Sequence, residues 1–251
     1  MKKFWDIFTD KLGKTIIHPQ YFLKYFEYQA VLEAKKYAKG EILVDIGCGR
    51  QPYKKDLLPY VKKYMGVDHP LVSKKYNSNE KPDLLADATN IPLPKNYCNI
   101  TLMISVLEHL PNPELAIKEA YRITKKGGTF ITITIQNYRL HDEPYDFFRY
   151  TKYGLKKIIE SSGFKISKIV PLGNYPILAS QYFNIFMLYQ IKKMFNKGLV
   201  NNIVATLFIP FVIITSFASN LLALVFSKLF KEDKSGSFAI YNLAIAKKLN
   251  K

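Results

Sequence analysis

Short apolar runs and amphipathic segments alternate through the first two thirds of the chain. Runs rich in β-branched and aliphatic residues predict strands at residues 42–46, 64–67, 83–86, 100–105, 129–135 and 164–170. Helices are predicted at residues 54–63 and 151–162, and after Asn112, where Pro113 and Glu114 give a strong start signal. This alternation predicts an α/β fold with a doubly wound, mostly parallel sheet and helices on both faces.

The alternation stops between residues 170 and 236. Two long uncharged runs, at 170–191 and 200–227, flank a basic patch of Lys192, Lys193 and Lys197. The second run is long enough to cross a bilayer. Residues 238–246 then predict one more strand. If that strand joins the same sheet, the chain leaves and returns on one side of any membrane, so a single crossing is excluded.

Two crossings, a re-entrant hairpin and helices lying in the interface all satisfy that constraint. Asn174, Gln181, Asn184 and Gln190 weaken the first run as a spanning helix, and Pro210 lies in the middle of the second. We therefore expect a shallow association with one leaflet. The alternative is a soluble helical cap over the active site, with its apolar faces buried against the core.

The pattern divides the chain into four parts. Residues 1–40 form an N-terminal helical segment, residues 41–170 the core, residues 171–236 a hydrophobic helical insertion, and residues 237–251 the last strand with a basic tail. Near the start, Phe4, Trp5, Phe8 and Leu12 recur at helical spacing among lysines, which is typical of a docked helix or of one on a membrane surface. Asp6 and these lysines argue against a cleavable signal peptide.

Composition narrows the choice of partners only slightly. The net charge of +17 suits nucleic acid, an anionic membrane or an acidic substrate, and the lysines are scattered along the chain. Cys48 and Cys98 are too few for a disulfide framework, which favours a reducing compartment. The histidines lie far apart in sequence, with no second ligand at metal-binding spacing, so no metal site is predicted.

The most informative motif follows the first predicted strand. Asp45 ends the strand, and Gly47, Cys48 and Gly49 form a turn with little room for side chains. Glycine permits positive φ there and lets a ligand approach the main chain. By itself this turn also fits any tight strand-to-helix connection. It nevertheless resembles the nucleotide-binding turn of the class I S-adenosylmethionine-dependent methyltransferases.

Later strand ends match that family in the same order. The resemblance implies that the residues of the first turn cradle the methionine part of the cofactor and that Asp68, after the second strand, accepts the ribose hydroxyls. Asp87 and Ala88, after the third strand, take the place near the adenine amino group. After the fourth strand, Ser105 opens a stretch that contains the Leu-Glu-His sequence of one branch of the family. The family implies a Rossmann-like, seven-stranded sheet and S-adenosylmethionine as the cofactor.

One position departs from the family pattern, because Gln51 stands where many members carry a third glycine. That glycine mainly eases helix packing, so its loss leaves cofactor binding in place. A nicotinamide-binding turn would need a glycine where Pro52 stands, which counts against a dehydrogenase. The Asn/Asp-Pro-Pro-aromatic turn of the base-amino methyltransferases is absent after the fourth strand, which makes a nucleic-acid acceptor a minor alternative.

Methyl transfer to a hydroxyl requires a base, and histidine has a suitable intrinsic pKa. His109 after the fourth strand and His141 after the fifth are the candidates, although either could be structural. Candidate acceptor-binding residues are Glu108, Asp142, Arg149 and Tyr150, of which Arg149 could pair with a phosphate or carboxylate.

The sequence therefore predicts a methyltransferase that acts on a small or lipid-linked acceptor, of sugar or isoprenoid type, with oxygen as the target atom. We expect it on the cytoplasmic side, peripheral or monotopic on the inner face of an anionic membrane. A membrane-bound, non-catalytic cofactor-binding module is the alternative from another functional class.

Overall fold

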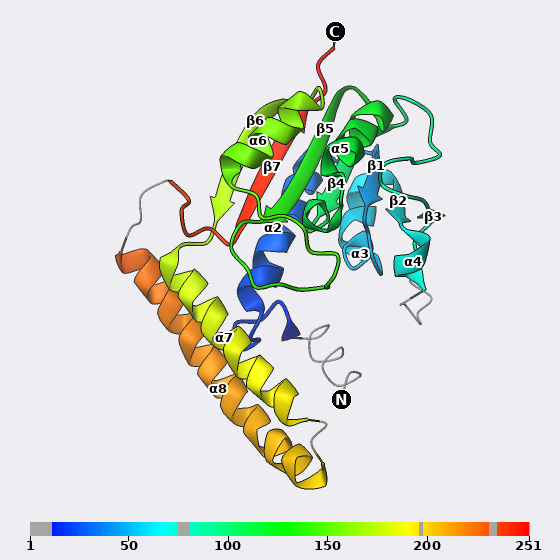
Figure 1. Ribbon diagram of the computed structural model, residues 1–251. Helices are drawn as coiled ribbons and strands as arrows, with labels where there is room; N and C mark the ends of the chain where they lie inside the picture. Colours follow the sequence, from blue (N-terminus) through cyan, green and yellow to red (C-terminus); the bar gives the residue numbers. More distant parts are fainter. Residues whose placement is uncertain (1–11, 75–80, 196–197, 231–234, 251) are drawn as a thin grey trace. The chain divides into compact units, whose positions relative to one another are not determined.

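The structure is a computed structural model that describes residues 12–74, 81–195, 198–230 and 235–250 (Figure 1). The chain forms two compact units. The sheet unit comprises Glu27–Pro171 and Tyr241–Lys251, and the hairpin unit comprises Met1–Phe26 and Leu172–Ile240. The helix predicted around Phe4, Trp5 and Phe8 lies outside the described residues.

The sheet unit contains a seven-stranded sheet in the order β3-β2-β1-β4-β5-β7-β6. Parallel pairing joins β1 to β2 and β4, β2 to β3, and β4 to β5, whereas β7 runs antiparallel to β5. The predicted α/β fold is therefore confirmed, together with the return of the last strand to the same sheet. The strands are β1 Glu41–Ile46, β2 Val61–Asp68, β3 Leu84–Leu85, β4 Cys98–Ile104, β5 Thr124–Ile135, β6 Lys165–Leu172 and β7 Tyr241–Lys247.

The central strands β4 and β5 carry apolar residues on both faces and are buried. Helices pack over the sheet and provide that burial, as is usual for parallel sheets. Helices α5 and α6 lie side by side on one face (Figure 1). The helical segments of the sheet unit are α3 Lys54–Leu57, η1 Leu58–Tyr60, α4 Pro70–Ser73, η2 Leu107–His109, α5 Pro113–Ile123, α6 Lys152–Ser161 and the later part of α2 Tyr21–Tyr37.

The predicted helix at residues 54–63 is wrong in its second half. Helix α3 ends at Leu57, a single 3-10 turn follows, and β2 begins at Val61. Pro59 accounts for the early end, because proline has no N–H with which to continue the α-helical hydrogen bonds. The start of α5 Pro113–Ile123 agrees with the predicted start after Asn112. Pro113 is at its first position, but the Asn112 side chain makes no capping hydrogen bond.

The hairpin unit is built on two long helices, α7 Tyr175–Met194 and α8 Leu199–Leu229, which pack against each other (Figure 1). Asn174 begins α7 by accepting a hydrogen bond from the Ile177 N–H at 3.3 Å, with Pro176 in the first turn. Helix α8 continues through Pro210. Ser227 donates to Asn174 at 2.9 Å, so the start of α7 and the end of α8 lie together.

Polar side chains gather between α7 and α8 rather than on their outer surface. Ser180 and Asn184 on α7 both bond to Asn220 on α8, at 3.1 and 2.9 Å. Asn220 in turn donates to the carbonyl oxygens of Ile16 and His18. We call Ser180, Gln181, Asn184, Ser216 and Asn220 the polar seam; all are buried.

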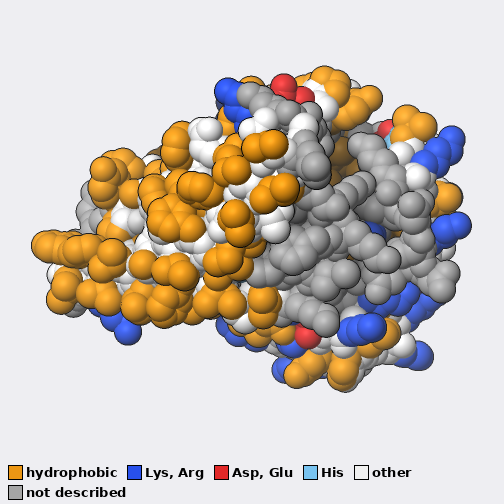
Figure 2. Space-filling view, turned by 90° about the horizontal axis from the view of Figure 1, so that it is seen from below, with side chains coloured by type: hydrophobic (Ala, Val, Ile, Leu, Met, Phe, Trp, Pro, Cys, Tyr) orange, Lys and Arg blue, Asp and Glu red, His pale blue; other side chains and the backbone are white. Residues whose placement is uncertain are grey.

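Large apolar side chains cover the outside of the same helices. Figure 2 shows them as a broad hydrophobic surface over the hairpin unit, at the left of the view. Among the described residues, one helix, Val200–Leu229, is long and apolar enough to cross a membrane, and only 22% of its most apolar window is buried. Exposed members of this surface include Phe183, Phe186, Val200, Leu207, Phe211, Ile214 and Leu229.

A glycine inside β5 tests the packing of the sheet. A Cβ on Gly128 would lie 2.8 Å from the carbonyl oxygens of Asn99 and Lys125, both part of the backbone. We expect Gly128→Ala to lower the free energy of unfolding by roughly 1–3 kcal/mol, the usual cost of overpacking. Gly154→Ala is the matched control, since its Cβ would meet only Thr151 Oγ1 at 3.5 Å. Urea unfolding of both variants measures the difference, and equal midpoints would contradict this packing.

Candidate functional site

The order of the strands creates a switch point between β1 and β4, and open α/β sheets bind ligands at such points. Gly47 follows β1 with φ +73°, and Val106 follows β4. A Cβ on Gly47 would overlap the side chain of Val106. Glycine is therefore required at this position for two reasons, its backbone conformation and the close approach of Val106.

The glycine turn folds over the end of β2. The N–H groups of Gly47 and Cys48 both donate to the Val67 carbonyl, at 2.8 and 3.1 Å. Gly49 donates to one carboxylate oxygen of Asp68 at 2.6 Å, and the His69 N–H donates to the other at 2.6 Å. The Asp68 carboxylate is thereby fixed beside the turn, at the position where the family resemblance expects a ribose acceptor.

Asp45 lies under this turn and is almost fully buried. Its carboxylate accepts a hydrogen bond from the Tyr64 hydroxyl at 2.5 Å. Burial raises the pKa of Asp45 to about 7, while the Tyr64 bond acts in the opposite direction. Burial also raises the pKa of Asp68, against the two N–H groups that stabilise its charge. A cationic group entering here would stabilise both carboxylates.

Asp87 and Ser105 mark the ends of the neighbouring strands. Asp87 is exposed, and one of its oxygens accepts from both the N–H and the hydroxyl of Thr89, which lowers its pKa. Ala88 beside it is half-buried. Ser105 has φ +53° and donates to the Tyr241 hydroxyl at 3.4 Å. The predicted cofactor residues therefore line the carboxyl edge of β1, β2, β3 and β4.

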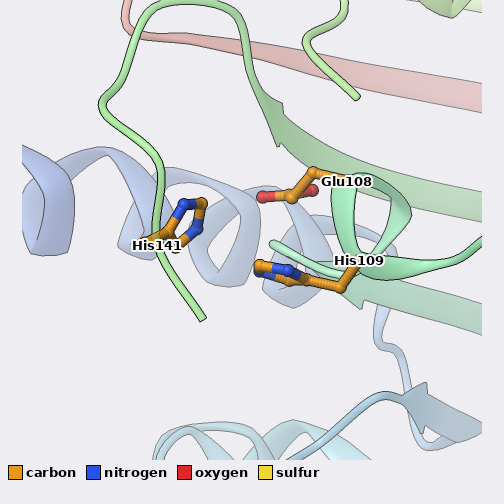
Figure 3. A group of neighbouring side chains, drawn as sticks. All are labelled: Glu108, His109 and His141. Atoms are coloured by element: carbon orange, nitrogen blue, oxygen red, sulfur yellow. The ribbon is translucent and has the colours of Figure 1, made fainter. Parts of the chain in front are cut away.

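Beyond β4 and β5, two histidines and a glutamate come together (Figure 3). The rings of His109 and His141 lie with their centroids 4.8 Å apart and their planes at 70°. Glu108, on the same 3-10 turn as His109, is fully buried. One ring nitrogen of each histidine and one Glu108 oxygen lie within 4.8 Å of one another. We call these three residues the His–Glu cluster.

Each histidine is oriented by a bond at Nδ1. His109 Nδ1 lies 2.6 Å from the Tyr145 carbonyl oxygen, and His141 Nδ1 lies 3.1 Å from Asp146 Oδ2. A carbonyl only accepts, and an ionised carboxylate does the same, so both Nδ1 atoms carry hydrogen, and in the neutral form of each ring Nε2 presents its lone pair. Burial lowers the pKa of His141, partly offset by the charge of Asp146.

Arg149 has a different role from the one expected. Its guanidinium donates to both oxygens of Asp146, at 2.6 and 2.7 Å. The remaining donors bond to the carbonyl oxygens of Tyr138, Phe148 and Arg139. With all five donors used inside the protein, Arg149 is a positioning residue that holds Asp146 against His141 rather than an acceptor contact.

Two other predicted acceptor residues have contrasting surroundings. Asp142 is exposed and has φ +52°. Tyr150 is buried, its hydroxyl has no hydrogen-bond partner within the described part of the chain, and burial raises its pKa. Glu108 accepts from Thr134 at 2.7 Å, and burial raises its pKa as well.

Sequence reasoning missed Asp146, Thr134 and Tyr64. Asp146 and Arg149 are three residues apart in an irregular segment, so no helical pattern marks them as a pair. Thr134 looks like one more β-branched residue of β5, and Tyr64 like an ordinary core residue of β2. Only the tertiary contacts give these three side chains their roles.

Comparison with known proteins identifies the core. Residues 44–132 match the family model described as "Methyltransferase domain". A ubiquinone/menaquinone biosynthesis C-methyltransferase, UbiE, of Neisseria meningitidis is 32% identical over 88 residues, covering 35% of this chain and 34% of the relative. A tRNA (carboxymethyluridine(34)-5-O)-methyltransferase of Arabidopsis thaliana is 34% identical over 143 residues, covering 51% of this chain and 34% of the relative.

The chain thus matches only about a third of the length of these curated relatives. Among solved structures, an S-adenosylmethionine-dependent methyltransferase from Thermotoga maritima aligns with a TM-score of 0.55 and 18% identity, covering 97% of this chain and 99% of that one. At this identity the structural likeness shows the fold alone.

The bidentate pair of Arg149 and Asp146 generates a prediction about the segment at 138–149. Arg149→Lys keeps the charge but cannot reproduce the planar fork. We expect faster amide hydrogen exchange in residues 138–149, with exchange in β4 and β5 unchanged. Arg139→Lys is the control, because Arg139 is exposed and its guanidinium bonds the Leu140 carbonyl. Equal exchange rates in residues 138–149 of the two variants would contradict the positioning role of Arg149.

Proposed function

We propose that this chain, which carries a class I S-adenosylmethionine-dependent methyltransferase domain, transfers methyl groups to a small or lipid-linked acceptor at a membrane surface. S-adenosylmethionine is the cofactor that we propose for the domain matched at residues 44–132. The acceptor we favour is of sugar or isoprenoid type and is methylated on oxygen. The observation that carries the proposal is the fixed Asp68 carboxylate beside the glycine turn, at the switch point of the sheet.

The donor half of the site supports this reading. Asp68 retains free lone pairs on both carboxylate oxygens, because each accepts a single backbone N–H, so it can also accept two ribose hydroxyls. Burial raises the pKa of Asp45 to about 7, so the cationic methionine part of the cofactor would favour its charged form when it binds. Asp87 and Ala88 remain the proposed neighbours of the adenine ring.

The acceptor half lies past the ends of β4 and β5. In the transfer, the carbon–sulfur bond of the sulfonium breaks as the carbon–oxygen bond forms, and the sulfur becomes a neutral thioether. The acceptor hydroxyl must also lose its proton. His141 and His109 both present Nε2 lone pairs, and Asp146 would stabilise the positive charge that His141 gains. We assign these two histidines to the acceptor proton and Glu108 to its orientation.

The hairpin unit supports the membrane part of the proposal. Its polar seam is buried and its outer faces are apolar. A helix pair whose outer surface faces water has the opposite arrangement, with apolar residues inside and polar residues outside. Exposed apolar surface on this scale is typical of protein or membrane contacts. A groove of about 600 Å³ on the hairpin, lined by Tyr175, Ala179, Phe183, Leu222 and Phe226 among others, could accommodate a lipid chain.

We propose a shallow, monotopic hairpin rather than two crossings. Helix α7, with 20 residues, is about 30 Å long, close to the thickness of the hydrocarbon core. However, Lys192 and Lys193 are exposed near the tip, and carrying each through hydrocarbon costs roughly 2.5–3.5 kcal/mol. In a one-leaflet arrangement the same lysines can reach anionic headgroups, each contributing about 1 kcal/mol.

A tRNA acceptor is the second candidate. The net charge of +17 and the 34% identity to a tRNA methyltransferase favour it. The apolar hairpin faces favour the lipid-linked acceptor, because a nucleic acid offers them no partner. Both candidates use the same donor half of the site.

Transfer of a labelled methyl group tests the function directly. We expect label from S-adenosylmethionine to enter a cell-lipid or glycan extract and not total tRNA. Asp68→Ala should weaken donor binding by about 1.5–3 kcal/mol, the worth of hydrogen bonds to a charged group, and abolish most labelling. Asp142→Ala is the control for donor affinity. Unchanged calorimetric affinity in folded Asp68→Ala would refute the donor site, and label in tRNA would select the second candidate.

Vesicle binding tests the membrane assignment. We expect the full chain to sediment with anionic vesicles, and the double variant Lys192→Glu with Lys193→Glu to sediment less at low salt. Deleting residues 174–235 across a short linker should release the protein while donor affinity is kept, since the predicted cofactor residues all precede the deletion. A full-length protein that is monodisperse without detergent and ignores vesicles would make the hairpin a soluble cap.

A further inference from the structure

We propose that the His–Glu cluster binds a divalent transition-metal ion, with one nitrogen from His109, one from His141 and one oxygen from Glu108 as ligands. This inference rests on the proposed function and changes how its acceptor half would work, because an Nε2 atom that binds a metal ion cannot also accept the acceptor proton. It departs from the expectation of no metal site, which rested on the wide spacing of the histidines in sequence. The fold brings them together because β4 and β5 are adjacent and parallel, so the segments after them start from the same edge.

The geometry of the cluster is the first support. The three candidate ligand atoms lie within 4.8 Å of one another, and Figure 3 shows the three side chains facing a common space. Nitrogen and oxygen ligands lie about 2.0–2.2 Å from zinc, which corresponds to ligand–ligand distances of about 3–3.5 Å in a tetrahedral site. Binding would therefore require the ligand atoms to move closer together by up to about 1–2 Å.

The carboxylate of Glu108 is the second and independent support. The residue is fully buried, and Thr134 donates to Oε2 at 2.7 Å. Oε1 is buried and has no hydrogen-bond partner among the residues that the structure describes. An unsatisfied, buried carboxylate oxygen is costly, and a cation bound to it would remove that cost.

The surroundings of the histidines match those of metal ligands. Nδ1 of each ring is already bonded, to the Tyr145 carbonyl and to Asp146, which leaves Nε2 as the ligating atom. A carboxylate behind a metal-bound histidine fixes its tautomer and increases its basicity. Arg149 holds Asp146 with two hydrogen bonds, so this outer layer is itself fixed.

The donor set indicates the class of ion. Two imidazoles and one carboxylate suit zinc, iron, cobalt or manganese, whereas magnesium and calcium prefer oxygen ligands. Three protein ligands leave a coordination position open for a further oxygen. An acceptor hydroxyl at that position would lose its proton to water more readily, and its oxygen would then attack the methyl group.

The test uses the full-length protein, freed of metal by chelation and carrying no histidine tag. We expect one equivalent of Co²⁺ to bind and to give visible ligand-field absorption, with Zn²⁺ competing and Mg²⁺ not. His141→Ala, His109→Ala and Glu108→Gln should each weaken Co²⁺ binding by more than about 100-fold. Asp146→Asn should weaken it by about 10–100-fold, as outer-layer changes do, and Glu160→Gln, at an exposed position of α6, should leave it unchanged.

Donor affinity, measured on every variant, shows that the sheet unit is folded. Metal binding is measured without donor or acceptor, so its failure leaves the methyl-transfer proposal intact, and failure of methyl transfer leaves the metal result intact. The proposal is overturned if the wild-type protein shows no saturable Co²⁺ binding. It is equally overturned if the Glu108→Gln and His141→Ala variants, with normal donor affinity, bind Co²⁺ as tightly as the wild type.

Discussion

The antiparallel ladder between β5 and β7 is the constraint on which both halves of the molecule depend. It pairs seven residues of each strand, from Thr129 with Lys247 to Ile135 with Tyr241. At one end it places the Tyr241 hydroxyl within hydrogen-bond distance of Ser105 and Glu27. It also fixes both ends of residues 173–240 to one sheet. The hairpin must therefore begin and end on the same side of any membrane, whatever its depth.

The sheet unit also buries several carboxyl groups. Asp45, Asp68 and Glu108 are buried carboxylates in a protein whose net charge is strongly positive. The lysines and arginines that produce this charge are not their main partners: Tyr64, backbone N–H groups and Thr134 are. Burial raises the pKa of all three carboxyl groups, and a cationic group that enters the site would favour their ionised form. The site therefore retains attraction for cationic groups, such as a sulfonium, an ammonium or a metal ion.

Local sequence patterns were sufficient for the sheet and for the glycine turn, because each depends on residues within one strand and its adjoining loop. Asp45, Gly47 and Asp68 could be placed at strand ends from the apolar pattern, and the family resemblance supplied their expected roles. The His–Glu cluster could not, since it depends on the pairing of β4 with β5 and on a loop without periodicity. The prediction that Arg149 contacts the acceptor was wrong for a related reason. Its partner Asp146 can be recognised only once the loop is folded. The apolar composition of residues 200–227 was enough to locate α8. The polar seam between α7 and α8 is visible only in the packed structure.

The order of the strands has a consequence for biosynthesis. β6 lies next to β7 and not next to β5, so it has no neighbour in the sheet until residues 241–247 have been synthesised. Until then β5 has an unpaired edge, and such edges promote association with other chains. Both long apolar helices emerge from the ribosome during this interval, before the sheet is complete. Capture of the hairpin by a lipid surface or a chaperone at that stage would protect the nascent chain, and the sheet would close last.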